Sequence, residues 1–336
     1  MLKFIVRRLL QAVLAMFMMS LLLFAWLRSL PGGPVSALLG ERGTPESAAA
    51  LREQLGLNDS IFVQYWRFLT RAVQGDFGIS NGVFRGQPAM EVFLQRFPAT
   101  IELSIIAIAI ALVLAIPLGY LAARRRGGIF DTGSVIFSLV GVAVPVFFLA
   151  YVLKYIFAVR WGLLPPSGRS GVGINATHIT NFYILDGIMT REWDAVWDAL
   201  KHLILPALAL SSIPFAIIFR ITRASVIEVM DEDYVRTARA KGLTSSTIRG
   251  RHIMRNALIP VVTIIGLQIG ALLAGAVLTE KVFAFPGIGD ALAQGFTLRD
   301  YPILQVVIMM AALIYIIVNL LVDIAYAIID PRVRTR

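Results

Sequence analysis

The segment richest in charged side chains runs from Asp233 to Pro260 and reads DYVRTARAKGLTSSTIRGRHIMRNALIP. Acidic residues at 231–233 precede a predicted helix over 234–241, where they offer an N-cap and complement the positive end of the helix dipole. Basic residues gather at the other end of this helix, and Gly242 suits the left-handed position that closes a helix. Thr244 is a candidate N-cap for a second helical piece. We interpret the segment as a charged docking element for a soluble partner, with an ordinary basic loop as the alternative.

The sequence does not contain the residues that several other kinds of chemistry require. It holds no cysteine, which excludes disulfides, thiolate nucleophiles and zinc–thiolate sites. The three histidines, His178, His202 and His252, are far apart, and no Walker loop, nucleophile elbow or HExxH helix is present. We therefore predict no catalytic residue, cofactor site or metal site in this chain. If ATP drives the protein, a separate chain must bind it.

Long apolar stretches surround the charged segment and place it at a membrane. Apolar residues make up 57% of the composition, and the mean hydropathy is +0.76. A continuous apolar run of roughly 18 or more residues predicts a spanning helix. Six such runs lie near residues 9–27, 99–123, 132–157, 202–222, 257–279 and 302–325. The sequence therefore predicts an all-α integral membrane protein with six transmembrane helices.

Basic residues are distributed unevenly between the two sides of this predicted bundle. With both termini inside, the inner segments hold 17 Lys and Arg against 7 Asp and Glu, whereas the outer segments hold 14 of each. The positive-inside rule favours this orientation, with N and C termini in the cytoplasm. The first run is longer than the apolar part of a signal peptide, about 7–15 residues, so we predict a retained helix. Topology and anionic lipids account for the basic excess, so no nucleic-acid partner is expected.

The predicted spans offer few polar groups that could line a pathway. No ionisable residue lies at mid-depth, where an ion-coupled carrier would need one. Gly266, Gly270 and Ala274 form a small-residue stripe, which indicates either a helix interface or a pathway wall. Asn319 and Asp323 share a helix face, and we interpret them as a contact between helices, with a substrate contact as the alternative. The candidate pathway residues are Gln268, Gly266, Gly270, Pro145 and Pro214.

At residues 236–243 the sequence resembles the EAA loop of ABC-importer permeases, a short coupling helix that docks into a groove of the ATPase subunit. Arg236 and Thr237 stand where glutamate and alanine are usual, and Pro260 lies 18 residues beyond Gly242, as in the peptide and nickel branch. TARAKGL followed by HIMRNALIP is similar to the B-type permease subunit of dipeptide and oligopeptide importers. The residues to which this resemblance assigns ATPase coupling are Arg236, Thr237, Ala238, Arg239, Lys241, Gly242 and Leu243.

Further motifs extend the resemblance over nearly the whole chain. They are LPGGPV at 30–35, LGLND at 55–59 with Gln64 and Tyr65, GDFGIS at 75–80, RFPATIEL at 96–103, FPGIG at 285–289, RDYP at 299–302, and NLLVD and DPRVR near the end. Gly33 departs from the family, which often has aspartate at that position. The resemblance implies the type I, MetI-like fold of ABC-importer permeases.

The apolar runs and the resemblance together divide the chain into four parts. These are an N-terminal helix (1–30), an external segment (31–98), a five-helix permease core (99–325) and a cytoplasmic tail (326–336). The core contains a second external segment at 158–201 and the coupling loop at 223–256. We expect the first external segment to lie on the membrane surface and meet a binding protein, or only to cap the pore. The second, rich in tryptophan, is expected to anchor at the membrane interface and secondarily to dock a partner.

The resemblance implies a multi-pass protein of the bacterial inner membrane that forms a heterodimer with a C-type permease. Two ABC ATPase subunits, which bind ATP and Mg²⁺, and a periplasmic or lipid-anchored solute-binding protein complete the implied importer. The implied cargo is a dipeptide or short peptide, with oligopeptides, glutathione and nickel complexes as alternatives. A secondary transporter, a channel and a membrane enzyme are alternatives from other classes. Each would need midplane charges, a repeated filter or a catalytic cluster that we do not find in the sequence.

Overall fold

The computed structural model describes residues 2–29, 35, 39, 44–54, 56–174 and 176–329 of the 336-residue chain. Within these ranges the backbone forms helices and their connections, and its β structure is limited to an isolated bridge between Ile79 and Pro88. The all-α prediction is therefore confirmed. The LPGGPV motif apart from Val35, with Gly33 in it, and the terminal DPRVR motif lie outside the described residues.

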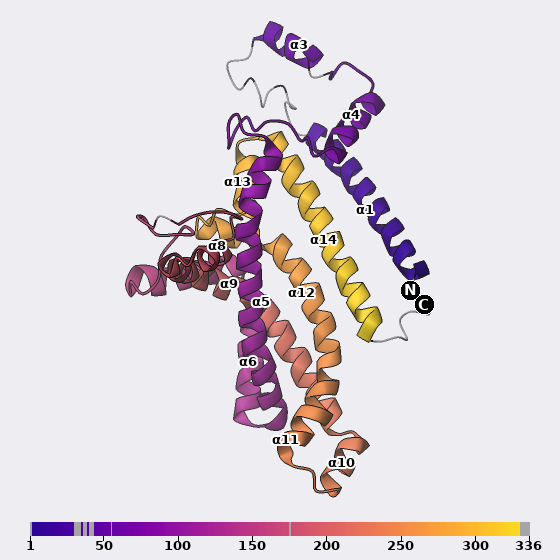
Figure 1. Ribbon diagram of the computed structural model, residues 1–336, viewed down its shortest axis with the longest axis vertical. Coiled ribbons are helices and arrows are strands. Elements are labelled where there is room, and N and C mark those ends of the chain that lie inside the picture. Colours follow the sequence, from indigo (N-terminus) through magenta and orange to yellow (C-terminus); the bar gives the residue numbers. More distant parts are fainter. Residues whose placement is uncertain are drawn as a thin grey trace.

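Long apolar helices form the body of the described chain (Figure 1). Among the described residues, five helices are long and apolar enough to cross a membrane. They are α1 (Leu2–Ser29), α5 (Ala89–Arg124), α9 (Trp193–Met230), α12 (Arg255–Val282) and α14 (Tyr301–Ile329). Five of the six predicted spans are therefore found as helices.

A bend interrupts the remaining predicted span. The helix α6 (Ile129–Ala143) meets α7 (Val146–Leu153), which continues into the π-helical η2 (Lys154–Arg160), at an angle of 104°. Pro145 lies at the break, and Val144 before it is extended, with ψ of 124°, because proline disfavours a helical backbone in the preceding residue. The prediction of one helix over 132–157 is therefore wrong. The described residues reach six spans only if the bent pair counts as one.

Small side chains bring α5 and α9 together at the centre of the bundle. Ala107, Ala111 and Ala115 repeat at intervals of four along α5 and are fully buried. At Gly119 an added Cβ would lie 2.9 Å from the Cβ of Thr222 on α9, so the two backbones approach closely only because residue 119 is glycine. This is the small-residue packing typical of membrane helices.

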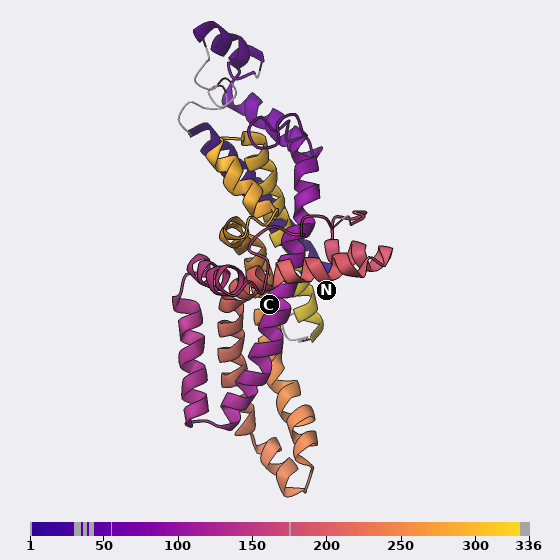
Figure 2. The same ribbon diagram turned by 90° about the vertical axis from the view of Figure 1, so that its left-hand side faces the viewer.

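The helix α9 contains Pro206 and Pro214 in its interior. Membrane helices tolerate proline where neighbouring helices satisfy the freed carbonyl groups. In Figure 2 the outer part of α9 lies across the bundle, and its inner part runs along it. Trp193 and Trp197, one turn apart near the start of α9, are both exposed. This position suits side chains that anchor a helix at a membrane interface, which supports the expectation for the second external segment.

The shorter helices gather at the two ends of the bundle (Figure 1). We call one end of the bundle the outer end and the other the inner end, after the orientation predicted from the sequence. At the outer end, beside the C-terminus of α1 and the N-terminus of α14, lie α3 (Pro45–Gln54), α4 (Ile61–Val73) and α13 (Ile288–Thr297). At the inner end lie α10 (Asp233–Ala240), α11 (Ser245–Thr247) and the π-helical η3 (Ile248–Met254). The helix α8 (Tyr183–Thr190) packs beside α9.

Candidate functional site

The segment between α9 and α12 folds into a compact tip at the inner end of the bundle (Figure 1). The helix α10 spans Asp233–Ala240, close to the predicted 234–241. Thr244 is the N-cap of α11, and its side chain accepts a hydrogen bond from the backbone N–H of Thr247. Both helical pieces of the charged segment are therefore confirmed, together with the predicted N-cap of the second.

Gly242 closes α10 in the left-handed conformation that the sequence predicts. Its φ is +70°, a value that L-residues with a side chain rarely adopt. The N–H of Gly242 donates to the carbonyl of Arg239 at 3.0 Å, and the N–H of Leu243 donates to the carbonyl of Ala238 at 3.3 Å. These two bonds form a Schellman motif, which ends the helix sharply and fixes the direction of the chain after it.

One face of α10 packs onto the body of the protein. Val235 is fully buried and Ala238 is 4% exposed. Both belong to an apolar cluster with Val226 of α9, Ile253 of η3 and Ala257 of α12. Ala238, assigned to ATPase coupling by the resemblance, thus faces the inside of the chain, where it would fix the position of α10 rather than contact a partner.

The opposite face of α10 and the turn after it are exposed. The exposed members of the predicted coupling set are Arg236, Thr237, Arg239, Lys241, Gly242 and Leu243. Arg236 pairs at 3.3 Å with Asp233, but both side chains are largely in solvent, where such a pair contributes little. Within the described part of the chain, Arg239 and Lys241 have no carboxylate partner. The surface is therefore basic, with one apolar side chain, Leu243, at its edge.

An ion pair joins the last part of α9, which leads into this tip, to a neighbouring helix. Arg223 of α9 donates to both carboxylate oxygens of Asp131 on α6, at 2.5 and 2.7 Å. The Asp131 side chain is 5% exposed and also accepts a hydrogen bond from the N–H of Gly127. A bidentate arginine–carboxylate pair fixes both distance and orientation. This pair therefore connects the part of α9 near Arg223 to α6, so that the two would move together.

We predict that Asp131→Asn destabilises the protein by about 2 kcal/mol, because Arg223, whose side chain is partly buried, loses its charge-assisted hydrogen bonds to the carboxylate. Reversing the pair with Asp131→Arg and Arg223→Asp should recover part of this loss. The measurement is thermal unfolding of the purified protein in detergent. Arg126→Gln is the control, because its pair with Asp231 is 64% and 69% exposed and should contribute under about 1 kcal/mol. Equal unfolding temperatures for Asp131→Asn and the control would contradict the prediction.

Two candidate pathway residues, Gly266 and Gly270, face another helix of the same chain. An added Cβ at Gly266 would overlap the side chain of Val322 on α14, and one at Gly270 would lie 2.9 Å from the ring of Tyr315. These contacts support the helix-interface alternative at both positions. The side chains of Ala274 and Asp323 are outside the described part, so the predicted Asn319–Asp323 contact is not tested.

The other candidate pathway residues occupy three different environments. Gln268 on α12 is half-buried, and no hydrogen bond of its amide is found among the described residues. Pro214 is buried inside α9, whereas Pro145 lies at the bend between α6 and α7. The structure does not bring these residues together into one site. Gln268 therefore stays a pathway candidate, with an amide that has no hydrogen-bond partner among the described residues.

At the outer end, a buried carboxyl group joins three helices whose contact was not predicted from the sequence. Glu280 of α12 is fully buried and accepts a hydrogen bond from the Thr100 hydroxyl of α5 at 2.6 Å. Its second oxygen accepts from the backbone N–H of Asp290, at the start of α13, at 2.9 Å. The Thr100 oxygen in turn accepts from the N–H of Ile288. Glu280 therefore caps α13 from a different helix.

The second external segment is joined to α5 by a buried ion pair. Arg169 donates to Glu102 at 2.7 Å, and both side chains are nearly inaccessible to solvent. The Arg169 guanidinium also stacks 3.7 Å from the centre of the Tyr183 ring. A second oxygen of Glu102 accepts from the N–H of Ile184 in α8. These contacts therefore hold the second external segment against the bundle.

The first external segment is attached to the start of α14 through Asp300. One oxygen of this buried carboxylate accepts from the Ser80 hydroxyl at 2.5 Å and from the N–H groups of Gly82 and Val83, both at 2.9 Å. Ser80 ends the GDFGIS motif and Asp300 belongs to RDYP. Two motifs 220 residues apart thus meet at one carboxylate.

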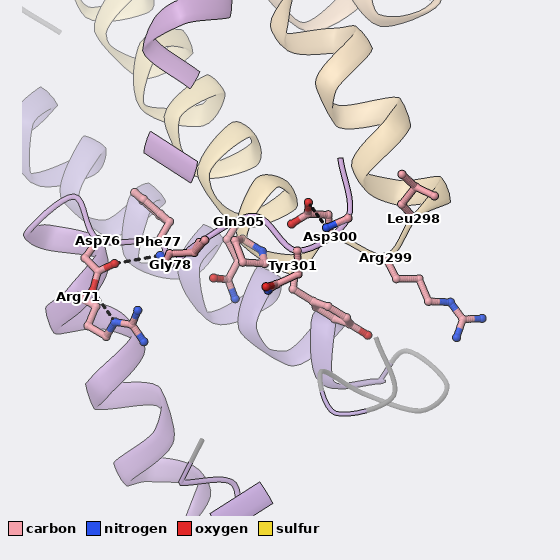
Figure 3. Close-up of a pocket in the computed structure, with 13 residues that line it drawn as sticks. Arg71, Asp76, Phe77, Gly78, Leu298, Arg299, Asp300, Tyr301 and Gln305 are labelled. Atoms are coloured by element: carbon pink, nitrogen blue, oxygen red, sulfur yellow. Dashed lines mark hydrogen bonds and ion pairs between the residues drawn. The ribbon is translucent and has the colours of Figure 1, made fainter. Parts of the chain in front are cut away.

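Beside this contact lies an outer groove of about 550 Å³, formed by the 76–82 loop and the turn before α14 (Figure 3). Asp76 and Arg71 face each other across its edge, and Arg71 donates at 2.9 Å. This hydrogen bond holds the pKa of Asp76 below its usual range. Arg299 projects on the far side, in a left-handed conformation with φ of +53°. The groove therefore has charged side chains and backbone polar groups at its rim.

The described bundle, with its long apolar helices and a capped basic helix at one end, defines a helical multi-pass membrane protein. The chain belongs to the family of binding-protein-dependent transport system inner membrane components, whose model matches residues 115–335. The N-terminal model of the binding-protein-dependent transport system membrane component matches residues 1–104. The protein is thus a multi-pass membrane permease subunit, not itself an enzyme, and works with ATPase and binding-protein partners.

Individual relatives cover the whole length of the chain. It is 43% identical over 338 residues to the dipeptide transport system permease protein DppB of Escherichia coli K12, covering 99% of each chain. It is 40% identical over 334 residues to DppB of Alkalihalophilus pseudofirmus, covering 99% of this chain and 100% of the relative. The glutathione transport system permease protein GsiC of Escherichia coli K12 is 35% identical, with 99% of each chain covered.

A solved structure supports the fold independently. A chain of the MetNI methionine ABC transporter, in an inward-facing conformation, matches with a TM-score of 0.55 at 15% sequence identity. The match covers 72% of this chain and 97% of that chain. The MetI-like permease fold implied by the resemblance is therefore confirmed.

Proposed function

We propose that this chain is the B-type permease of an ATP-driven importer that carries dipeptides or other short peptides across the bacterial inner membrane. The observation that carries the proposal is the 43% identity, over the full length, to a dipeptide permease. A second permease of the C type would form the other half of the pathway. The glutathione permease at 35% identity keeps glutathione as a second candidate cargo. Oligopeptides and nickel complexes remain further alternatives.

We propose that the exposed face of α10 docks on the ATPase subunit at the cytoplasmic side. Its basic side chains and Leu243 are accessible, whereas Val235 and Ala238 tie the helix to α9, η3 and α12. When ATP closes the ATPase pair, a pull on α10 would pass through this apolar cluster into two spanning helices. The Asp131–Arg223 pair would pass it on to α6, so that the bundles rock between inward and outward states.

The outer groove beside Asp300 is the part of the first external segment that we propose meets the solute-binding protein. Its charged rim supports this assignment over a segment that only caps the pore. The substrate-binding protein would then deliver its cargo at the outer end of the bundle. In both proposals, other subunits bind and hydrolyse the ATP.

The proposal is tested by uptake of a labelled dipeptide into proteoliposomes that contain this chain with its second permease, its ATPases and its binding protein. We expect uptake to require both ATP and the binding protein. Unlabelled glutathione, a long peptide and a nickel complex, each in excess, serve as competitors. Labelled glutathione, a labelled long peptide and a radioactive nickel complex are then offered to the same vesicles one at a time. Uptake of one of these compounds without uptake of the dipeptide would keep the importer and replace the cargo. Uptake without ATP would overturn the importer itself.

A further inference from the structure

The helix α4 exposes an apolar stripe that the rest of the described chain does not cover. Phe62, Trp66 and Val73 are 81%, 65% and 82% exposed, and their spacing of four and seven residues places them on one side of a helix. None of the residues of α4 is buried. Such a set of large apolar side chains on an outer helix calls for a partner.

The neighbouring side of α4 packs against α1. The hydroxyl groups of Tyr65 and Ser20 lie 2.8 Å apart, and the Tyr65 ring contacts Phe24 edge-on at 5.2 Å. Gln64 accepts hydrogen bonds from the Arg28 guanidinium at 2.9 and 3.1 Å. These contacts fix α4 beside the outer part of α1 rather than beyond its end.

The contacts between α1 and α4 lie below the outer end of the apolar span of α1, and this depth indicates where α4 sits relative to a bilayer. The apolar span in α1 runs over Val6–Ser29, so Ser20 lies nine residues inside its outer end. At 1.5 Å per residue this is about 14 Å along the helix. The hydrocarbon core of a bilayer is about 30 Å thick, so the Tyr65 side chain reaches below the headgroup level. The backbone of α4 then lies at the boundary between headgroups and acyl chains.

The residues around the apolar stripe are of the types found at the boundary between headgroups and acyl chains. The adjoining part of α1 exposes Leu22, whose natural surroundings in a spanning helix are acyl chains. Trp66 is of the residue type that collects at membrane interfaces. Arg67 and Arg71 extend from the same helix and pair with Asp59 and Asp76, which keeps their charged ends in a polar layer. An amphipathic helix with these features binds in the plane of a lipid surface.

We infer that α4 lies in the outer leaflet, with Phe62, Trp66 and Val73 inserted between lipid headgroups and the first acyl segments. The lipid surface is the partner of this stripe, beyond the proteins named in the proposed function. Because Arg71 and Asp76 link α4 to the loop that Asp300 holds, the bilayer also sets the height of the outer groove.

The sequence provides a direct test because it contains no cysteine. Single-cysteine variants Phe62→Cys and Val73→Cys carry an environment-sensitive NBD label, with Leu22→Cys as the lipid reference and Asn58→Cys, exposed just before α4, as the water reference. The full chain is reconstituted with its partner subunits in nanodiscs. The unsubstituted chain in the same complex gives the background from partner cysteines. Quenching by doxyl-labelled phospholipids is compared with quenching by aqueous iodide.

We expect doxyl lipids to quench the label at 62 and 73 at least about threefold more than at 58, and a doxyl group at carbon 5 to act better than one at carbon 12. Iodide quenching equal to that at Asn58 would place α4 in water and overturn the inference. Protection from both quenchers would mean that a protein covers the stripe, which would also overturn it. Labelling of the chain reconstituted alone would then show whether that protein is a partner subunit.

Discussion

The variant Gly242→Val is expected to lower ATP-dependent uptake at least about tenfold while ATP hydrolysis and membrane insertion continue. An L-residue in the left-handed conformation costs roughly 1–2 kcal/mol, and a β-branched side chain is among the least suited to it. A change of about 1.4 kcal/mol corresponds to a factor of ten in rate or equilibrium. No atom of the described residues lies within 4 Å of an added Cβ at Gly242, so we expect the local effect to come from backbone strain.

The strain is confined to the turn after α10. We therefore expect the mutation to lower the uptake per ATP hydrolysed more than it lowers the stability of the protein. If the Schellman bonds to Arg239 and Ala238 break, Lys241 and Leu243 leave the positions that we propose contact the ATPase. Gly242→Asn should retain most uptake, because asparagine tolerates the left-handed region. Gly250→Ala is the matched control: Gly250 also has open space around it, but it has no positive φ. The measurement is uptake per ATP hydrolysed, and an unchanged ratio in Gly242→Val would refute the coupling role of this turn.

Features set by neighbouring residues in the chain were predictable from the sequence. The bounds of α10, the left-handed Gly242 and the N-cap at Thr244 depend on residues within a few positions of one another. The long apolar runs also predicted most spans correctly, because the bilayer makes the length of an apolar stretch decisive. The bend at Pro145 was missed because prolines elsewhere in this chain, such as Pro214, lie inside continuous helices. Proline alone does not distinguish a break from a tolerated kink.

Pairs between distant residues were not predictable. Asp131 and Arg223 are 92 residues apart, and Thr100 and Glu280 are 180 apart, so no periodicity connects them. The signal that could have pointed to Glu280 is its position: an acid at the outer end of an apolar span needs a partner. The partners are the Thr100 hydroxyl and the backbone N–H of Asp290, the residue after the FPGIG motif. A backbone N–H is present at almost every position, so the sequence does not show which one is used.

Replacing Glu280 by alanine is expected to destabilise the protein by about 3 kcal/mol or more. The change leaves the Thr100 hydroxyl and the N–H of Asp290 without an acceptor in a region closed to water, and each unsatisfied group costs about 1–3 kcal/mol. It also opens a cavity, since Gly287 fits against the carboxyl group so closely that an added Cβ there would overlap it. Glu280→Gln should be intermediate, because one carbonyl oxygen remains while the amide N–H₂ opposes a donor.

The expected loss is measured as the fall in thermal unfolding temperature of the detergent-purified protein, with Glu91→Ala as the control. Glu91 lies on the exposed start of α5, where a substitution changes stability by under about 0.5 kcal/mol. Gly287→Ala perturbs the same contact by placing a methyl group against the Glu280 carboxyl group. It should therefore lower the unfolding temperature, although it removes no hydrogen-bonding group. If Glu280→Ala alone is destabilised, the hydrogen bonds hold α13 in place; if both variants are, close packing contributes as well. Wild-type stability in Glu280→Ala would show that α13 is held at the outer end without this carboxyl group.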